Sequence, residues 1–216
     1  MSEHAGASSK AIKVWGRATS NNVKKVMWCI GELGVPHERI DWGGKFGGQA
    51  DPAYLARNPN GRVPCIEDGG LVLWESNAIV RYLASQYGHG SLWPADNRAR
   101  ADADRWMDWQ VSSIVMHDRV VRHGLIRTNH WARDNIAIEV AQRRLAQSFG
   151  TLDKVLADRP FLAGDTFTMG DIPLGVMAFH WFSFPMERPA LVHFERWYRR
   201  LAEREAFKTH VAIPLN

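Results

Sequence analysis

The stretch NPNGRVPCIEDGGLVLWESNAIVRYLA, residues 58–84, decides the fold of this chain. Two short β-type runs flank the turn at residues 68–70, and this order of strand, glycine-bearing turn and strand is typical of a hairpin. After the hairpin, Ile79 and Leu83 mark the apolar side of a helix that we expect from residue 75 to about residue 87. The stretch therefore predicts strand, strand and helix in succession.

The residues before this stretch alternate between strand and helix patterns. A β-type run ends at Gly16, and apolar residues then recur on one helix face until Gly34 and Pro36 end the pattern. Asp51-Pro52 is a typical helix start. In chain order we expect a strand at 12–15, a helix at 23–33, a strand at 37–42, a loop at 43–49 and a short helix from 51 to about 57.

The residues after the stretch have a different character. Residues 88–98 have the composition of a linker, and later segments show helical patterns at 98–123, 129–156, 169–184 and 190–204. Strands followed by helices indicate an α+β fold of segregated type. We predict a flexible tail at 1–10, a mixed domain at 11–87, a linker at 88–98 and an all-helical domain at 99–216.

Composition excludes several classes of protein. The chain has 216 residues, of which 45% are hydrophobic and 23% charged, as in ordinary globular proteins. No apolar run approaches the roughly 20 residues that span a bilayer, and the N-terminus lacks the apolar region of a signal peptide. Cys29 and Cys65 make no disulfide framework, which favours the cytoplasm. No nucleic-acid motif accompanies the net charge of +4, and the nine histidines lack metal-ligand spacing, so we expect neither nucleic acid nor metal.

Pro64 lies between a turn and the first strand of the hairpin. Proline cannot donate to a sheet ladder, so it belongs at a strand's first residue, at an edge or at a bulge. A cis Val63-Pro64 bond would turn the Val63 peptide groups outward, where an extended peptide can pair with them. A trans bond at the start of an edge strand explains the spacing equally well.

Two predicted helices begin with polar residues: Ser20 and Asn21 precede the first, and Glu75 and Ser76 precede the helix after the hairpin. Unpaired N–H groups at a helix N-terminus suit a carboxylate or a thiolate. Capping of the helix explains the same residues without any ligand. Both interpretations stay open at this level.

Three motifs together resemble the cytosolic glutathione transferase family over nearly the whole chain: TSNNVKKVMW at 19–28, the stretch 58–84, and FTMGDIPLG at 167–175. The third is similar to the family's capping box, with Thr168 as the cap and Asp171 at the reciprocal position. The resemblance implies a thioredoxin-like N-terminal domain with a mixed four-stranded sheet, followed by an all-α helical bundle.

The resemblance also implies how glutathione, the co-substrate, is bound. Val63, before a cis Pro64, would pair with the backbone of its cysteine. Glu75 and Ser76 would hold the γ-glutamyl end.

The remaining contacts to glutathione follow from the same resemblance. Gln49, and either Arg62 or Lys45, would reach the glycine carboxylate. Ser20 stands where serine-type members carry the hydroxyl that stabilises the thiolate, and Asn21 is the second choice.

The second substrate is expected to be a small hydrophobic electrophile bound between the domains. Trp106, Trp109 and His117 are the candidates for its pocket, with Met116 and Trp181 as further ones. Tryptophans at this i, i+3 spacing are also typical of a helical bundle core. The family implies a homodimer that transfers glutathione to an electrophilic carbon in detoxification.

Two other functions stay open. Peroxide reduction, disulfide-bond reduction and isomerisation share the same thiolate, and a non-catalytic protein that binds glutathione or another ligand would keep the fold. The first tyrosine is Tyr54, which excludes the tyrosine-type classes of the family. No cysteine lies in 19–22, which argues against a thiol-transferase of the omega or beta kind. We expect Cys29 and Cys65 to be small buried hydrophobic residues rather than nucleophiles.

Overall fold

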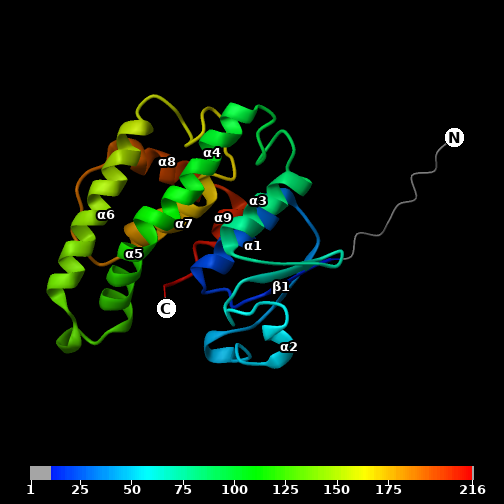
Figure 1. Cartoon of the computed structure of the whole chain (residues 1–216). Helices are drawn as coiled ribbons and strands as arrows, with labels where there is room; N and C mark the ends of the chain where they lie inside the picture. Colours follow the sequence, from blue (N-terminus) through cyan, green and yellow to red (C-terminus); the bar gives the residue numbers. More distant parts are fainter. Residues whose placement is uncertain (1–10, 216) are drawn as a thin grey trace.

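The computed structural model describes residues 11–215 and begins with a four-stranded sheet (Figure 1). The strands are β1 (Ile12–Trp15), β2 (His37–Ile40), β3 (Cys65–Asp68) and β4 (Leu71–Trp74). Their order is β2-β1-β3-β4, with β1 parallel to β2 and antiparallel to β3, and β3 antiparallel to β4. This mixed sheet confirms the prediction, although β2 ends two residues before the expected 42. The tail predicted at 1–10 lies outside the described residues.

The tight hairpin between β3 and β4 depends on two glycines. Gly69 and Gly70 have φ values of 55° and 97°, which side chains with a Cβ rarely adopt. Positive φ at both central residues matches the right-handed twist of the flanking strands. The Asp68-Gly69-Gly70 sequence therefore sets the register that pairs Cys65 with Trp74.

Helices cover both faces of the sheet (Figure 1). The helices α1 (Asn21–Leu33) and α3 (Ser76–Tyr87) pack together over the face that buries Val14 and Ile66. The short helix α2 (Pro52–Leu55) covers the other face, where Trp15, Tyr54 and Cys65 form a small separate core. Between β2 and α2, the predicted loop contains the 3-10 turn η1 (Gly44–Phe46).

Helices follow from residue 97 onward. They are α4 (Asn97–Trp109), α5 (Val115–Arg122), α6 (Asn135–Val155), α7 (Asp171–Ser183), α8 (Val192–Ala202) and α9 (Glu205–His210). The predicted helix at 98–123 is interrupted by a π-helical segment, η2 (Gln110–Ile114), and a second one, η3 (His123–Arg127), follows α5. A 3-10 turn, η4 (His130–Ala132), precedes α6, so the helix expected from 129 starts six residues later.

The start of α7 holds the helical part together. Asp171 is fully buried and accepts hydrogen bonds from the N–H of Leu162 at 3.0 Å, the N–H of Thr168 at 2.9 Å and the indole Nε1 of Trp197 at 2.9 Å. The predicted reciprocal bond from Asp171 to Thr168 is therefore present. The Thr168 hydroxyl accepts from the N–H of Gly170 at 3.3 Å.

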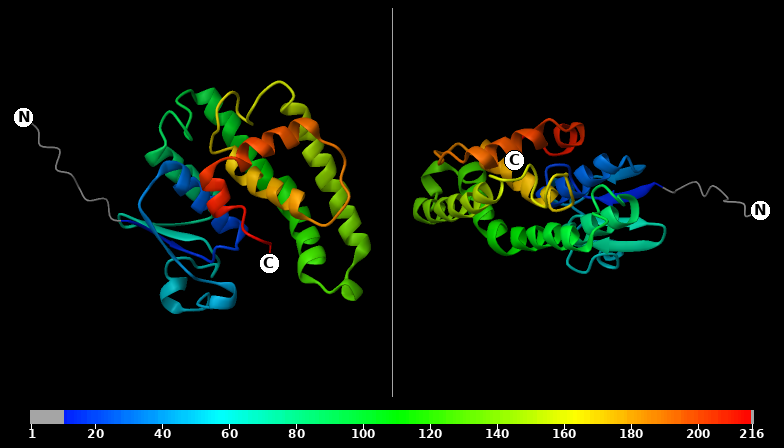
Figure 2. Two further views of the ribbon diagram at one scale, coloured as in Figure 1. Left: turned by 180° about the vertical axis from the view of Figure 1, so that it is seen from behind. Right: turned by 90° about the horizontal axis from the view of Figure 1, so that it is seen from above.

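The two parts of the chain are packed closely against each other. Leu92, in the predicted linker, is buried, and its carbonyl accepts from the N–H of Met169 at 3.0 Å. Figure 2 shows α9 (red) beside α1 (blue), and Lys24 of α1 donates to the carbonyls of Val211 and Ile213 after α9. Within residues 11–215, no helix combines the length and apolar character needed to cross a membrane.

Candidate functional site

The loop before β3 presents a peptide group without a partner. The Val63-Pro64 bond is cis, and within residues 11–215 neither the N–H nor the C=O of Val63 forms a backbone hydrogen bond. The preceding carbonyl of Arg62 is held by two donors, the hydroxyl of Tyr54 and the amide Nδ2 of Asn58, each at 2.7 Å. Tyr54 and Asn58 are buried, so the loop is fixed while Val63 stays available to an extended ligand.

The start of α3 lies beside this loop and has an unusual backbone. Among the described residues, Glu75 is the one non-glycine residue with positive φ, at 71°. Such a conformation costs on the order of 1–3 kcal/mol and recurs at functional sites. The Glu75 side chain makes no capping hydrogen bond to α3, so helix capping does not explain it. Ser76, the first residue of the helix, is 5% exposed.

Lys25 is a site residue that the sequence analysis missed. Its side chain is 2% exposed, and the ammonium donates to Asn77 Oδ1 and Gln110 Oε1, each at 3.2 Å, and to Ser76 Oγ at 3.4 Å. Burial lowers the pKa of Lys25 to about 7, against the opposing effect of Glu75 and Asp118. A signal existed in the sequence, because two lysines interrupt the apolar residues of VKKVMWCI at 23–30.

Ser20 lies at the start of α1 with a free hydroxyl. It occupies the N-cap position with φ −79° and ψ 125°, but its side chain makes no capping hydrogen bond. Its carbonyl accepts from the N–H of Lys24 at 2.8 Å, which is the first backbone hydrogen bond of α1. Both Ser20 and Asn21 are half-buried. The hydroxyl of Ser20 is thus available to an anion at the helix N-terminus.

Two adjoining cavities connect these groups. The Ser76 cavity, of about 210 Å³, is lined by Asn22, Lys25, Asn58, Asn60, Arg62, Val63, Pro64, Glu75, Ser76, Asn77, Val111 and Val115. The second cavity, of about 310 Å³, is lined by Arg17, Thr19, Ser20, Asn21, Asn22, Arg62, Gln110, Val115, Asp118, Arg119, Arg122 and Met177. We call it the arginine cavity after its four arginines. Because Asn22, Arg62 and Val115 line both, the cavities form one cleft between the sheet domain and the helices that follow it.

The structure brings together most of the predicted site residues. Ser20, Asn21, Arg62, Val63, Pro64, Glu75 and Ser76 all line this cleft. Gln49 is exposed and lines neither cavity, although its carbonyl lies close to Gly61. Lys45 lines a neighbouring cavity that shares Arg17 and Thr19 with the arginine cavity.

The predicted apolar pocket residues lie elsewhere. Trp106, Trp109 and His117 line neither cavity of the cleft; Trp106 is buried and meets Trp109 edge to face with ring centroids 5.5 Å apart. Trp181 is buried in the core against Phe149. The i, i+3 spacing of the two tryptophans thus brings their rings together, as in bundle packing, and their role in a substrate pocket stays a prediction. The cleft beside Ser20 is instead mostly polar and cationic.

Neither cysteine of the chain is suited to act as a nucleophile. Cys29 and Cys65 are both buried and unpaired. Burial raises the pKa of the Cys29 thiol far above its usual range and that of Cys65 to about 11. Since the thiolate is the reactive form of a thiol, any sulfur chemistry in this cleft depends on a thiol supplied by a ligand.

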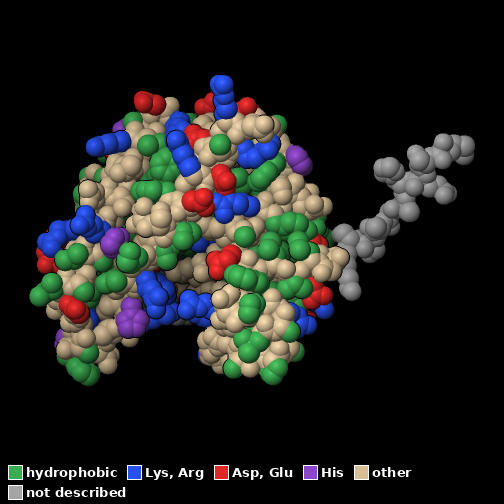
Figure 3. Space-filling model, in the orientation of Figure 1, with side chains coloured by type: hydrophobic (Ala, Val, Ile, Leu, Met, Phe, Trp, Pro, Cys, Tyr) green, Lys and Arg blue, Asp and Glu red, His purple; other side chains and the backbone are tan. Residues whose placement is uncertain are grey.

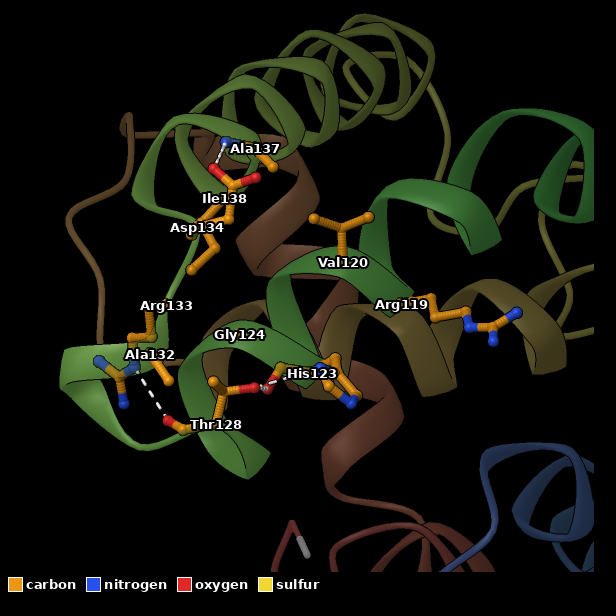
Figure 4. Close-up of a pocket in the computed structure, with 10 residues that line it drawn as sticks. All are labelled: Arg119, Val120, His123, Gly124, Thr128, Ala132, Arg133, Asp134, Ala137 and Ile138. Carbon is orange, nitrogen blue, oxygen red and sulfur yellow. Dashed lines mark hydrogen bonds between the residues drawn. The ribbon is translucent and has the colours of Figure 1, made fainter.

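Another cavity lies between α5 and the start of α6 (Figure 4). Asp134 caps α6 there by accepting from the N–H of Ala137 at 2.9 Å, and Thr128 donates to the carbonyl of His123 at 3.0 Å. In Figure 4 the Arg119 side chain extends away from the other labelled residues. Arg119 also lines the arginine cavity, so this arginine belongs to the rim of both.

Comparisons with known proteins agree with this geometry. Two family models match the chain, "Glutathione S-transferase, N-terminal domain" over residues 10–85 and "Glutathione S-transferase, C-terminal domain" over residues 129–200. The glutathione S-transferase GstB of Escherichia coli is 41% identical over 207 residues, which cover 95% of this chain and all of the relative. Glutathione S-transferase 3 of Zea mays is 34% identical and covers 94% of this chain, with 95% of its own length matched.

Solved structures give the same result. A theta class glutathione S-transferase from the citrus canker pathogen Xanthomonas axonopodis pv. citri, solved with glutathione bound, superposes with a TM-score of 0.92 at 47% sequence identity. The match covers 95% of this chain and 99% of that one. The similarity thus extends over both the sheet domain and the helices.

Proposed function

We propose that this chain, which belongs to the glutathione S-transferase family, binds glutathione in the cleft and activates its thiol for attack on an electrophilic carbon. The proposal rests on one observation. A single cleft contains two groups that form no hydrogen bond within the protein, the Val63 peptide and the Ser20 hydroxyl. An extended tripeptide that pairs with Val63 directs its two ends toward different walls of the cleft.

The γ-glutamyl end of glutathione fits the Ser76 cavity. Its carboxylate is expected at the N-terminus of α3, where free N–H groups and the Ser76 hydroxyl donate to it. Lys25 adds positive charge beneath this position through its bond to Ser76 Oγ. Glu75, exposed at the cavity rim, is the partner that we assign to the α-amino group. Arg62 lines both cavities and is the residue we assign to the glycine carboxylate.

The thiol of glutathione is expected beside Ser20. Lowering its pKa from about 8.5 to about 6.5 requires roughly 2.7 kcal/mol of preference for the charged form. A hydrogen bond from one hydroxyl to an anion contributes about 1.5–3 kcal/mol, and the start of α1 adds its dipole. Ser20 therefore supplies most of the required stabilisation without any proton-transfer group of the protein. The protein would then accelerate the transfer reaction in two ways, by forming the thiolate and by holding the two reactants close together.

Isothermal titration calorimetry with reduced glutathione tests the binding step. We expect binding to the wild type and a large loss of affinity in Ser76→Ala, whose hydroxyl and helix position hold the carboxylate. A folded wild-type protein that fails to bind glutathione would contradict the proposal and favour a non-catalytic role for the fold.

A panel of substrates tests the reaction type. An aryl halide, an organic peroxide and a glutathione mixed disulfide all draw on the same thiolate, but only the first measures transfer to carbon. We expect transfer to carbon to be the fastest of the three relative to the uncatalysed reaction. A protein that turns over only the peroxide or the disulfide would replace the transferase assignment with the corresponding reduction.

We also propose that the chain forms a homodimer in the cytoplasm. Leu71 and Val72 are exposed apolar residues on β4, the edge strand of the sheet, and a second copy would cover them. The two unpaired thiols fit a reducing compartment. Light scattering coupled to gel filtration measures the dimer directly, and a monomer mass at micromolar concentration would contradict it.

A further inference from the structure

The arginine cavity has an unbalanced charge. Of the residues that line it, Arg17, Arg62, Arg119 and Arg122 are cationic and Asp118 alone is anionic. Asp118 is buried, and its Oδ1 already accepts a hydrogen bond from His180 Nδ1 at 2.8 Å. The wall that faces Ser20 therefore presents an excess of positive charge to anything bound there.

Among the described residues, the arginines in this wall have few protein partners. Within residues 11–215, Arg17 and Arg119 form no ion pair, in contrast to Arg105 of α4 and Arg143 of α6. The Nε of Arg122 is buried without a hydrogen-bond partner, and the nearest carboxylate oxygen, Oδ2 of Asp118, is 4.0 Å away. A buried guanidinium donor with no acceptor is costly, so a ligand that supplies one is favoured.

The same arginines also repel one another. The pKa of Arg122 is lowered by burial and then by the charges of Arg127, Arg17 and Arg119, against the effect of Asp118. The pKa of Arg17 is lowered by burial and by Arg127, which lines the neighbouring cavity. Figure 3 shows Lys and Arg side chains (blue) gathered in the hollow between the two lobes of the molecule. Such an arrangement of like charges is relieved by a bound anion.

The position of the cavity indicates what that anion is. The cavity extends from Ser20 toward α5, whereas Val63 and Ser76 line the other end of the cleft. Under the proposed function, glutathione's thiolate lies between the two ends, and the arginine cavity receives the reacting partner. A volume of about 310 Å³ holds a small molecule, and the planar fork of arginine matches a carboxylate with two parallel hydrogen bonds.

We propose that the second substrate is an electrophile that carries a carboxylate, held by Arg119 and Arg122 so that its reactive carbon meets the thiolate at Ser20. This inference rests on the proposed function and departs from the hydrophobic electrophile expected from the sequence. For an aryl halide, the thiolate sulfur forms a bond to the ring carbon that carries chlorine. The C–Cl bond then breaks, and chloride leaves with the electron pair; the thiol proton has already passed to solvent.

A matched pair of electrophiles tests the inference. 4-Chloro-3,5-dinitrobenzoate and its methyl ester share a reacting carbon and differ in charge, and each rate is divided by its uncatalysed rate with glutathione. One hydrogen-bonded charge pair corresponds to about tenfold or more. We therefore expect the normalised kcat/KM of the acid to exceed that of the ester by about tenfold. This ratio should fall as salt is added, because salt screens the charge pair.

Variants locate the effect. In Arg119→Gln and in Arg122→Gln, we expect the preference for the acid to fall about tenfold while the rate with the ester and the KM for glutathione change less than twofold. Arg119 is exposed, so its replacement leaves the core intact. Arg144→Gln is the matched control, because Arg144 is an exposed arginine of α6 that lines neither cavity of the cleft.

The outcomes separate this inference from the proposed function. Equal normalised rates for acid and ester in the wild type would overturn the inference and leave the transferase assignment intact. A raised KM for glutathione in Arg119→Gln, with an unchanged preference for the acid, would overturn it as well, because the arginines would then hold glutathione itself. If neither electrophile reacts, the transferase assignment fails. Calorimetry then compares the two glutathione conjugates, and tighter binding of the carboxylate conjugate supports the anion site, whereas equal binding overturns it.

Discussion

Replacing Ser20 by alanine isolates the hydroxyl that we assign to the thiolate. The side chain of Ser20 makes no capping bond, so its full hydrogen-bonding capacity is available to the ligand. At about 1.5–3 kcal/mol for a bond to an anion, its loss corresponds to a rise of about 1–2 units in the thiol pKa of bound glutathione. We therefore expect that pKa to rise from about 6.5 to between about 7.5 and 8.5 in Ser20→Ala.

The rate follows from the same numbers. At pH 6.5 the thiolate fraction falls about 5- to 50-fold, but a thiolate of higher pKa is intrinsically more nucleophilic, with a Brønsted coefficient of about 0.4–0.5. The two effects together leave a net decrease in kcat of about 2- to 8-fold. At pH 9 the variant is also largely ionised, so its more nucleophilic thiolate should make its rate about 2- to 8-fold higher than that of the wild type. The free energy of unfolding should change by less than about 0.5 kcal/mol, because no capping bond is lost.

Two measurements check this prediction: the ultraviolet absorbance of the bound thiolate as a function of pH, and kcat with an aryl halide over the same range. Asn21→Ala is the matched comparison, because Asn21 lines the same cavity one residue further on. An unchanged thiol pKa in Ser20→Ala together with a raised one in Asn21→Ala would transfer the role to Asn21. If neither variant alters the pKa, this loop does not stabilise the thiolate, and the reasoning is wrong.

Three further predictions concern buried polar residues. In Lys25→Met, we expect loss of a pH effect on stability. Burial lowers the pKa of Lys25 to about 7 while the unfolded value is about 10.4, so the unfolded chain binds more protons between these values and stability rises with pH there. Denaturant unfolding at pH 7 and pH 9 should show a smaller rise for the variant than for the wild type, and equal rises would contradict the assignment. In Asp171→Ala, three buried donors lose their acceptor, and at about 1–3 kcal/mol each we expect a loss of at least 3 kcal/mol in the free energy of unfolding. A loss below 1 kcal/mol by chemical denaturation would show that water replaces the carboxylate. In Asn58→Ala, the Arg62 carbonyl loses a donor at 2.7 Å, and calorimetry should show weaker glutathione binding by about three- to tenfold; full affinity would mean that Tyr54 alone holds the loop.

Local patterns were sufficient for most of the fold. The hairpin at 65–74 and the helix that starts at Ser76 depend on turn residues and on apolar spacing within one short stretch, so they were predicted closely. The π-helical segments at 110–114 and 123–127 were not predicted, because an extra residue in one turn leaves the apolar spacing of a long helix nearly unchanged. The six residues of α9 are too few for a periodic pattern, so they were missed.

By itself the sequence placed Ser20 and Ser76 at helix starts and Val63 just before a strand, and the family resemblance implied that these three ends meet at one ligand. Only the tertiary structure decided the character of the cleft beyond them. Lys25 was hidden within an apolar helix, and Arg119 and Arg122 lie in a segment that looks like an ordinary solvated helix face. They become a site because α5 lies opposite the loop at 17–22, about a hundred residues away in the chain. A sequence pattern shows the spacing of residues along one helix or strand, but it does not show which charged residues of another element will face them.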